Sequence, residues 1–363
     1  MTHCQRRERL AACLAVEGLD ALLVSDLVNV RYLTGFTGSN AALLVFADDT
    51  PPVLATDSRY RTQAARQAPD LHAAIDRACG RHLIGRAADY GVRRIGFESH
   101  VVTVDGFDAL SAELTGLSAE LVRASGTVEA LREIKDAGEV ALLRLACGAA
   151  DAALTELVHG GGLRPGRTER AVARQLEALM LEHGADGPSF ETIVAAGANS
   201  AVPHHRPTDA VLARGDFVKI DFGALVGGYH SDMTRTFVLG NAADWQCEIY
   251  GVVSAAQQAG VDAARDGAAL SEVDGAARRI IADAGYGDHF GHGLGHGVGL
   301  QIHEAPGINS AAAGALRAGS VVTVEPGVYL PDRGGVRIED TLVVAVRDPE
   351  LLSGFSKELT VVD

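Results

Sequence analysis

The second part of this 363-residue chain repeats one order of secondary structure, and this repetition limits the folds that are open to it. The apolar pattern predicts two helices, at about residues 137–158 and 168–183, followed by strand-like segments. The same order returns with helices at about 243–265 and 271–285 and further strands. Helix, helix and strand pair, occurring twice, predict a mixed α/β (α+β) domain with pseudo-twofold halves.

A different pattern precedes this repeat. Between residue 21 and about residue 125, short apolar runs alternate with helical stretches, which is typical of a smaller α/β domain with mostly buried strands. Asp136 and Glu139 have the spacing of a capping box at the start of a long helix. We therefore expect two domains, residues 1–127 and residues 128–363, with the boundary just before that helix.

Composition argues against several classes of protein. Forty-seven acidic and thirty-two basic residues leave a formal charge of −15, which repels nucleic-acid phosphates and anionic lipids. The five cysteines are odd in number, lie far apart and form no Cys-x-x-Cys pair, which suits a reducing cytoplasm. No apolar run approaches the ~18 residues of a membrane span. We expect a cytoplasmic protein that binds neither nucleic acid nor membrane.

Two aspartates flank a glycine turn between two predicted strands. A hairpin centred between Val226 and Gly227 would place Asp221 and Asp232 directly opposite each other. Their Cβ atoms would then lie about 5 Å apart. Two ionised carboxylates at this distance repel each other, so the pair predicts a cation between them.

Two glutamates repeat this arrangement further along the chain. Glu325 and Glu339 would also form a cross-strand pair if the intervening turn is centred on Asp332. For any single acid, a solvated position on an edge strand is the simpler interpretation. Four acids at compatible pairing distances instead favour a site with two metal ions about 3.5 to 4 Å apart.

Histidines gather in two short segments that could contribute to such a site. A lone histidine is more often a core or surface residue, but several beside acidic hairpins are better interpreted as ligands or proton carriers. A glycine-rich segment lets the backbone approach a site closely, and a segment bounded by prolines predicts a loop. The glycine-rich segment contains His292, His296 and His303, and the proline-bounded loop contains His204, His205 and Arg206.

The local sequences around these residues resemble the dinuclear metallopeptidases of family M24, which have the pita-bread fold. The likeness is greatest to Xaa-Pro aminopeptidases and Xaa-Pro dipeptidases (prolidases). It extends to NVRYLTGFTGSNAALLVF, which looks like the family's creatinase-like amino-terminal domain. The matching motifs are Asp221 in KIDFGA, Asp232 in HSDMTRTF, His296 in GHGLGHGVGL, Glu325 in VEPGVY and Glu339 in GVRIED. The resemblance implies a pita-bread catalytic domain preceded by a smaller creatinase-like domain.

The resemblance also implies two divalent metal ions, held at the five matching positions. Asp232 and Glu339 would bridge both ions, while Asp221 and His296 would each bind one. Glu325 would bind one ion and stand near the attacking water. Because four carboxylates and one imidazole form this set, Mn²⁺ (manganese) is the expected metal, with Co²⁺ or Zn²⁺ as alternatives.

Further site residues follow from the same likeness. His204 and His303 match active-site histidines, and with Glu325 they form the implied catalytic set. His292 and Arg337 match residues of the substrate pocket and its surroundings. In the implied reaction, Glu325 passes a proton to the leaving nitrogen while the histidines stabilise the developing oxyanion.

The implied activity is that of a Xaa-Pro aminopeptidase, a metallo-exopeptidase that hydrolyses the bond between an N-terminal residue and a following proline. A prolidase, which cleaves only dipeptides ending in proline, is the alternative, and Arg206 could serve either enzyme. A metal-free or non-catalytic pita-bread protein is a second alternative, although four buried carboxylates without cations would be costly. The expected substrates are proline-containing peptides, and the expected assembly is a homodimer.

Overall fold

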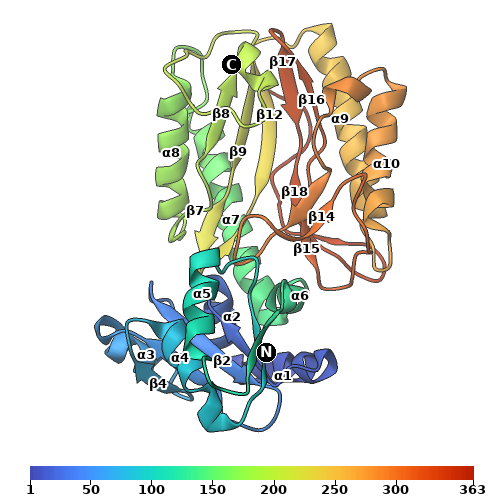
Figure 1. Ribbon diagram of the computed structural model, residues 1–363. Helices are drawn as coiled ribbons and strands as arrows, with labels where there is room; N and C mark the ends of the chain where they lie inside the picture. The colour runs from blue at the N-terminus through green and yellow to red at the C-terminus, as the bar shows by residue number, and fades with distance from the viewer. The chain divides into compact units, whose positions relative to one another are not determined.

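A six-stranded mixed sheet forms the centre of the first of two units, Met1–Arg132, in the computed structural model (Figure 1). The structure describes residues 1–363, except for the side chain of residue 88. Strands β1 (Ala21–Val24) and β2 (Ala41–Phe46) are buried along their whole length, as their unbroken apolar runs predict. Across the sheet the order is β4 (His72–Ile75), β3 (Val53–Thr56), β2 (Ala41–Phe46), β1 (Ala21–Val24), β5 (Arg94–Phe97) and β6 (Glu120–Arg123).

Helices and short 3-10 turns connect these strands. Helix α1 begins with a capping box between Thr2 and Gln5 and ends at Gly18, whose φ of 67° is the left-handed conformation that favours glycine. The elements are α1 (His3–Glu17), α2 (Leu27–Thr34), η1 (Ser58–Tyr60), α3 (Arg61–Gln67), α4 (Cys79–Gly85), η2 (Ala87–Tyr90), α5 (Val104–Glu113) and α6 (Thr127–Arg132).

The division between the units falls after α6, between Arg132 and Glu133, whereas the sequence pattern places the boundary between residues 127 and 128. Helix α6 packs with α1 and α2 of the first unit. The Tyr32 hydroxyl also donates to the Leu131 carbonyl oxygen at 3.3 Å. These contacts attach α6 to the first unit, although it lies next to the second in the sequence.

The second unit, Glu133–Asp363, contains the predicted order of helix pair and strands twice (Figure 1). Asp136 caps α7 and exchanges hydrogen bonds with Glu139, which confirms the predicted capping box. The first half comprises α7 (Ala137–His159), α8 (Glu169–Glu182), β8 (Ile193–Ala196), η3 (Gly197–Ala201), β9 (Phe217–Phe222) and β12 (Met233–Leu239). The second half comprises α9 (Asp244–Ala263), α10 (Leu270–Asp283), η4 (Gly287–His289), β13 (Gly295–Gly297), β15 (Val321–Val324) and β18 (Asp340–Val343).

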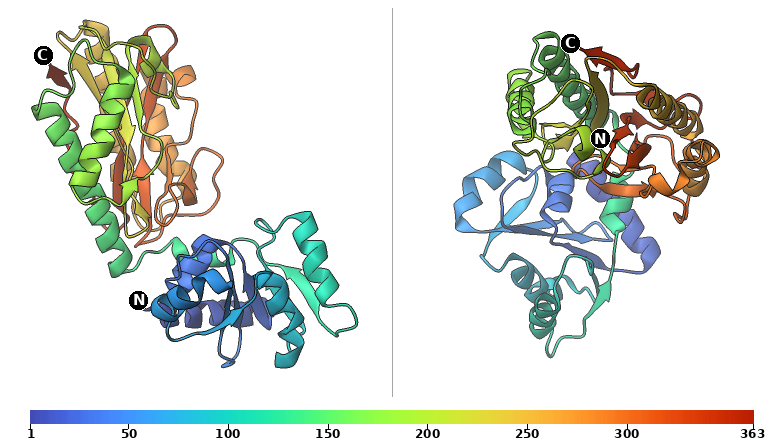
Figure 2. Two further views of the ribbon diagram at one scale, coloured as in Figure 1. Left: turned by 90° about the vertical axis from the view of Figure 1, so that its left-hand side faces the viewer. Right: turned by 90° about the horizontal axis from the view of Figure 1, so that it is seen from above.

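Each half has its own main sheet, and two apolar clusters form the core of the unit. In the right-hand view of Figure 2, the pair α7 and α8 (green) and the pair α9 and α10 (gold to orange) lie at the periphery of the strands. Leu176 of α8 packs in one cluster with Phe222 of β9, and Val273 of α10 packs in another with Val322 of β15. This arrangement is the pita-bread architecture that the sequence predicts. Among the described residues, no helix is long and apolar enough to cross a membrane.

The strands of this unit form four sheets. The orders are β20–β12–β9–β8, β14–β13–β15–β18–β19, β11–β10–β7 and β16–β17. The strands not yet given bounds are β7 (Gly187–Pro188), β10 (Ala224–Val226), β11 (Tyr229–His230), β14 (Glu304–Ile308), β16 (Gly327–Leu330), β17 (Gly334–Arg337), β19 (Glu350–Leu351) and β20 (Thr360–Val362).

The register between β9 and β12 differs from the prediction. Val226 pairs with Tyr229, so the two glycines between them, with φ of 57° and 83°, form the centre of the turn. A two-residue turn with both central φ values positive is the favoured hairpin connection, and its centre lies one residue later than predicted. Asp221 therefore pairs with Thr234 and not with Asp232. The predicted direct pairing of the two aspartates is wrong.

The second acidic hairpin has the predicted register. Val324 pairs with Asp340 at the end of β15–β18, and Gly327 pairs with Arg337 at the start of β16–β17. Glu325 and Glu339 thus occupy facing positions between these two ladders. The turn contains Asp332 with a φ of 60°, a left-handed conformation that aspartate tolerates better than most residues. The cross-strand placement of the glutamates is confirmed.

Candidate metal centre and active site

A cavity of about 460 Å³ in the second unit brings together all the site residues predicted from the sequence. They come from strands, strand ends and loops in both halves, so the fold collects them from positions far apart in the chain. The predicted residues that line it are His204, Asp221, Asp232, His292, His296, His303, Glu325, Arg337 and Glu339. Their common location makes this cavity the candidate active site.

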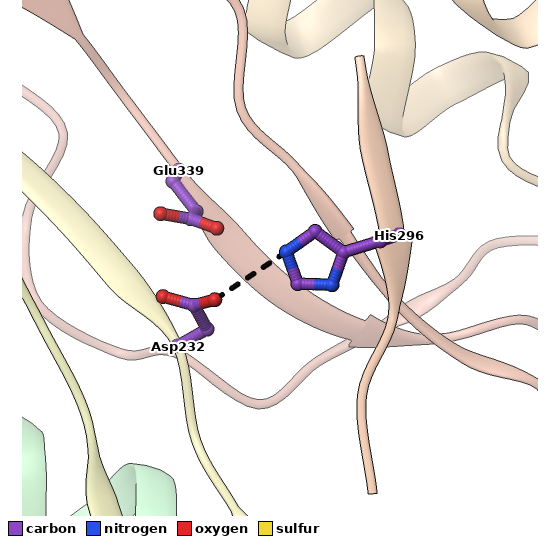
Figure 3. Close-up of side chains that lie close together, drawn as sticks. All are labelled: Asp232, His296 and Glu339. Carbon is purple, nitrogen blue, oxygen red and sulfur yellow. Dashed lines mark ion pairs between the residues drawn. The ribbon is translucent and has the colours of Figure 1, made fainter. Parts of the chain in front are cut away.

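Three of the predicted ligands face one another at its centre (Figure 3). One ligand atom each from Asp232, His296 and Glu339 lies within 4.8 Å of the other two. The Nε2 atom of His296 is 3.5 Å from Asp232 Oδ2 and 3.4 Å from Glu325 Oε1. Its Nδ1 atom is 3.0 Å from the Gly297 carbonyl oxygen, and if Nδ1 donates there, the lone pair of Nε2 faces the carboxylates.

The glycines around His296 allow strand β13 to lie close to its neighbours. A Cβ atom at Gly295 would lie 2.0 Å from the Thr323 carbonyl oxygen, and one at Gly297 would lie 2.1 Å from that of Ala305. Because these contacts are with backbone, a side chain at either position would displace a strand. The glycine-rich sequence therefore holds the imidazole of His296 at a fixed depth in the cavity.

Arg337 lies buried beside the carboxylates and provides a permanent positive charge. Its Nη2 atom donates to Asp221 Oδ2, and its Nε atom is 3.9 Å from Glu325 Oε2. It also donates to the Tyr329 hydroxyl at 2.9 Å and to Thr234 Oγ1 at 3.0 Å. Burial lowers the pKa of Arg337. The nearby Tyr329, Asp221 and Glu325 raise it by a larger amount, so the net shift is upward. The guanidinium neutralises part of the acidic cluster.

The single positive charge of Arg337 does not balance the negative charges of the acidic cluster. Burial, and next the repulsion from Glu339, raises the pKa of Asp232 well above its usual range. Burial, and next the repulsion from Glu325, does the same to Glu339. Burial also raises the pKa of Glu325, to about 7, with a contribution from Asp221. The raised pKa values favour protonated Asp232 and Glu339 near neutral pH, and leave Glu325 about half protonated, unless a further cation replaces the protons.

The chemistry of the donor atoms fits divalent metal ions. Asp221 Oδ1 and Glu339 Oε1 are buried and have no hydrogen-bond partner, while the second oxygen of Glu339 accepts from Thr234 Oγ1 at 2.7 Å. A buried carboxylate oxygen without a partner is costly, and a bound cation removes that cost. Carboxylate oxygens with one imidazole nitrogen are ligands that divalent metals accept.

Further histidines line the cavity around this cluster, among them His204, His292 and His303. The ring of His303 lies edge to face with that of His296, with 4.4 Å between centroids. His292 Nε2 is 2.9 Å from the Tyr329 hydroxyl. Burial, aided by the charge of Arg337, lowers the pKa of His292 to about 4 and also lowers that of His204. His204 and His292 are therefore neutral near pH 7 and can each donate a hydrogen bond.

Some residues at the site are not predicted from the sequence. Thr234 lies two positions after Asp232, so the period of two in a strand could have placed it on the same face. Tyr329 supports both His292 and Arg337, but nothing in its local sequence marks it. The cavity is also lined by Phe190, Glu191 and Ile302, whose local sequences carry no signal of a site.

We expect the metal-free protein to lose thermal stability as the pH rises from about 5 to about 8. The folded-state pKa of Glu325 is about 7, above its usual 4.5, so folding keeps a proton that the unfolded chain releases. This stabilisation is complete below pH 4.5 and is lost as the pH passes through about 7. Melting curves with a chelator and with added Mn²⁺ test it. Equal pH slopes in both conditions contradict the expectation.

Comparison with known proteins agrees with these observations. Residues 141–345 match the model of metallopeptidase family M24, and residues 6–134 match that of the creatinase/prolidase N-terminal domain. An uncharacterized peptidase of Bacillus subtilis, YqhT, is 41% identical over 98% of this chain and 99% of its own length.

Solved structures match over nearly the whole chain as well. The Xaa-Pro dipeptidase from Bacillus anthracis is 37% identical, with a TM-score of 0.93 over 99% of this chain and 100% of its own. An X-Pro aminopeptidase from Thermotoga maritima is 33% identical, with a TM-score of 0.88 over 98% of this chain and 99% of its own. Several other relatives and structures bear the name Xaa-Pro dipeptidase or prolidase.

Proposed function

Because the chain belongs to metallopeptidase family M24, we propose that it is a Xaa-Pro dipeptidase (prolidase), which hydrolyses dipeptides ending in proline. The observation that carries this proposal is the buried group of carboxylates and one imidazole in a cavity of about 460 Å³. The names of the relatives favour the dipeptidase over the aminopeptidase that the sequence analysis places first. The aminopeptidase is the second candidate, supported by the match to the Thermotoga maritima structure.

The proposal includes two divalent ions, with Mn²⁺ as the native metal. The residues that would hold them are Asp221, Asp232, His296, Glu325 and Glu339. The buried, unpartnered oxygens of Asp221 and Glu339 support this assignment. When bound, such ions lower the pKa of water and polarise the substrate carbonyl.

The residues of the chain supply the other parts of the reaction. Glu325 lies between His296 and Arg337, so it is placed to receive a proton from the attacking water and to pass it to the proline nitrogen. His204 and His303 donate hydrogen bonds to the carbonyl oxygen as negative charge develops there. The bond before proline lacks an N–H group, so apolar contacts of Phe190 and Ile302 with the proline ring take over recognition.

A pair of peptides tests this function. We expect the Mn²⁺-loaded protein to hydrolyse Ala-Pro at least about tenfold faster, in kcat/KM, than Ala-Pro-Ala, because a prolidase must hold the free carboxylate of proline and tenfold corresponds to about 1.4 kcal/mol. The assay follows release of free alanine. A preference for the tripeptide contradicts the dipeptidase and supports the aminopeptidase. Absence of cleavage of both contradicts the whole proposal.

We also propose that the chain acts as a homodimer in the cytoplasm. The five cysteines are all free, and Cys79 and Cys147 are buried, which suits a reducing compartment. The likeness of residues 6–134 to the creatinase/prolidase N-terminal domain supports a dimer. Light scattering should give about twice the 37.8 kDa mass of the chain, and a monomeric mass contradicts the dimer.

A further inference from the structure

A pair of opposite charges lines the cavity and has no part in the mechanism above. Arg206 Nε lies 3.3 Å from Glu191 Oε2, and both residues line the cavity that contains the acidic cluster. Glu191 lies between β7 and β8, and Arg206 lies in the loop between η3 and β9. Their side chains are 62% and 82% exposed, so the pair is at the mouth of the cavity and not at its floor.

A dipeptide ending in proline brings its own carboxylate into this cavity, close to the bond that is cleaved. Of the described residues that line the cavity, Arg206 and Arg337 are the two with a permanent positive charge. Arg337 is buried, and its donors already bind Asp221, Thr234 and Tyr329. Arg206 differs because it is exposed. Its guanidinium can release Glu191 and bind another carboxylate without leaving a buried charge unpaired.

We propose that Arg206 binds the terminal carboxylate of the substrate, and that Glu191 takes the place of this carboxylate when the site is empty. The assignment rests on the proposed Xaa-Pro dipeptidase function and names the residue that selects a free proline carboxylate. It also gives Glu191 a role, because its charge competes with the substrate for Arg206.

The energetics of the exchange are favourable. An exposed ion pair contributes little to stability, so replacing the carboxylate of Glu191 by that of the substrate costs little. A guanidinium can bind a carboxylate through two parallel N–H donors, and such charge-assisted hydrogen bonds strengthen where a ligand displaces water. Arg206 is also two positions after His204 in the same loop. A carboxylate bound to Arg206 would therefore lie close to the histidine that is proposed to contact the reacting bond.

Two substrates that differ only in the terminal charge test the assignment in the full-length, Mn²⁺-loaded protein. Arg206→Gln should lower kcat/KM for Ala-Pro about tenfold, mainly through KM, and change that for Ala-Pro-amide by less than about twofold. Glu191→Gln should lower KM for Ala-Pro about threefold, because the competing charge is gone. Arg214→Gln is the matched control, since Arg214 is an exposed arginine paired with Asp363 and is not among the cavity-lining residues.

The outcomes separate this assignment from the proposed function. If the unaltered protein cleaves Ala-Pro and Arg206→Gln leaves its kcat/KM unchanged, the role of Arg206 is overturned and the dipeptidase stands. Equal losses with the acid and the amide also overturn it, because they indicate a structural role of the loop. A higher KM in Glu191→Gln contradicts the competition. If the unaltered protein cleaves neither compound, both proposals are overturned.

Discussion

Asp232→Asn is expected to reduce the hydrolysis of Xaa-Pro dipeptides by about a thousandfold or more and to remove bound metal. Asp232 has one of the three ligand atoms that lie within 4.8 Å of one another, with Oδ2 3.5 Å from His296 Nε2. Asparagine keeps the shape of the side chain but loses the negative charge and one oxygen. The metals are worth several kcal/mol to the transition state, and about 4 kcal/mol corresponds to a thousandfold in rate.

The matched control is Asp209→Asn, which removes an aspartate that is 78% exposed and paired with Arg170. This variant should retain full activity and metal content. Steady-state rates and elemental analysis of both variants complete the experiment. Substantial turnover by Asp232→Asn without metal would show that the acidic cluster does not hold a catalytic ion.

The second large effect is on the stability of the protein, and it concerns the buried ion pair between Arg235 and Asp340. Asp340→Leu should lower the free energy of unfolding by about 3 to 5 kcal/mol, because it leaves the buried charge of Arg235 without its carboxylate. The two side chains are 1% and 2% exposed, with 2.7 Å between Arg235 Nη2 and Asp340 Oδ1. Asp340 also accepts hydrogen bonds from Gln257 at 2.9 Å and pairs with Lys357 at 2.8 Å. Denaturant unfolding of the metal-free protein measures the loss.

A second variant shows whether the unpaired charge causes this loss. The double substitution Arg235→Met with Asp340→Leu should cost less than the sum of the two single substitutions, because it leaves neither member of the pair charged and alone. The exposed Asp209→Asn should change stability by less than about 0.5 kcal/mol. A loss below about 1 kcal/mol in Asp340→Leu would contradict the importance of the pair.

The helices of the fold could be predicted from the sequence because their signals are local. The Asp136–Glu139 capping box fixes the start of α7, and Gly18 fixes the end of α1. Strand β4 (His72–Ile75) has a weaker signal, because it is short and partly exposed and offers no long apolar run.

The positions of the acidic residues could be predicted only where the turn that sets the strand register could be placed correctly. The turn at Asp332 places Glu325 opposite Glu339 as expected, whereas the turn between β10 and β11 is centred on two glycines, one residue later than predicted. A shift of one residue at the turn moves each partner by two positions, so Asp221 pairs with Thr234. Glycine pairs favour two-residue turns, and this preference could have corrected the prediction.

Other features of the site depend on contacts that no local pattern contains. The guanidinium of Arg337 reaches Asp221 across more than a hundred residues of sequence, and the hydroxyl of Tyr329 joins His292 to Arg337. The charges at the mouth likewise come from separate segments. Such contacts arise only when the chain folds, so the family resemblance could name Arg337 and His292 but the local sequence could not give the partners that hold them.

The central proposal is that buried carboxylates from both halves of the second unit hold divalent ions for peptide hydrolysis. Elemental analysis of the purified, active protein, alongside its rate on Ala-Pro, tests it most directly. We predict two divalent ions per chain, and activity that disappears with a chelator and returns in proportion to added Mn²⁺. Full activity in a protein with no stoichiometric metal would contradict this account.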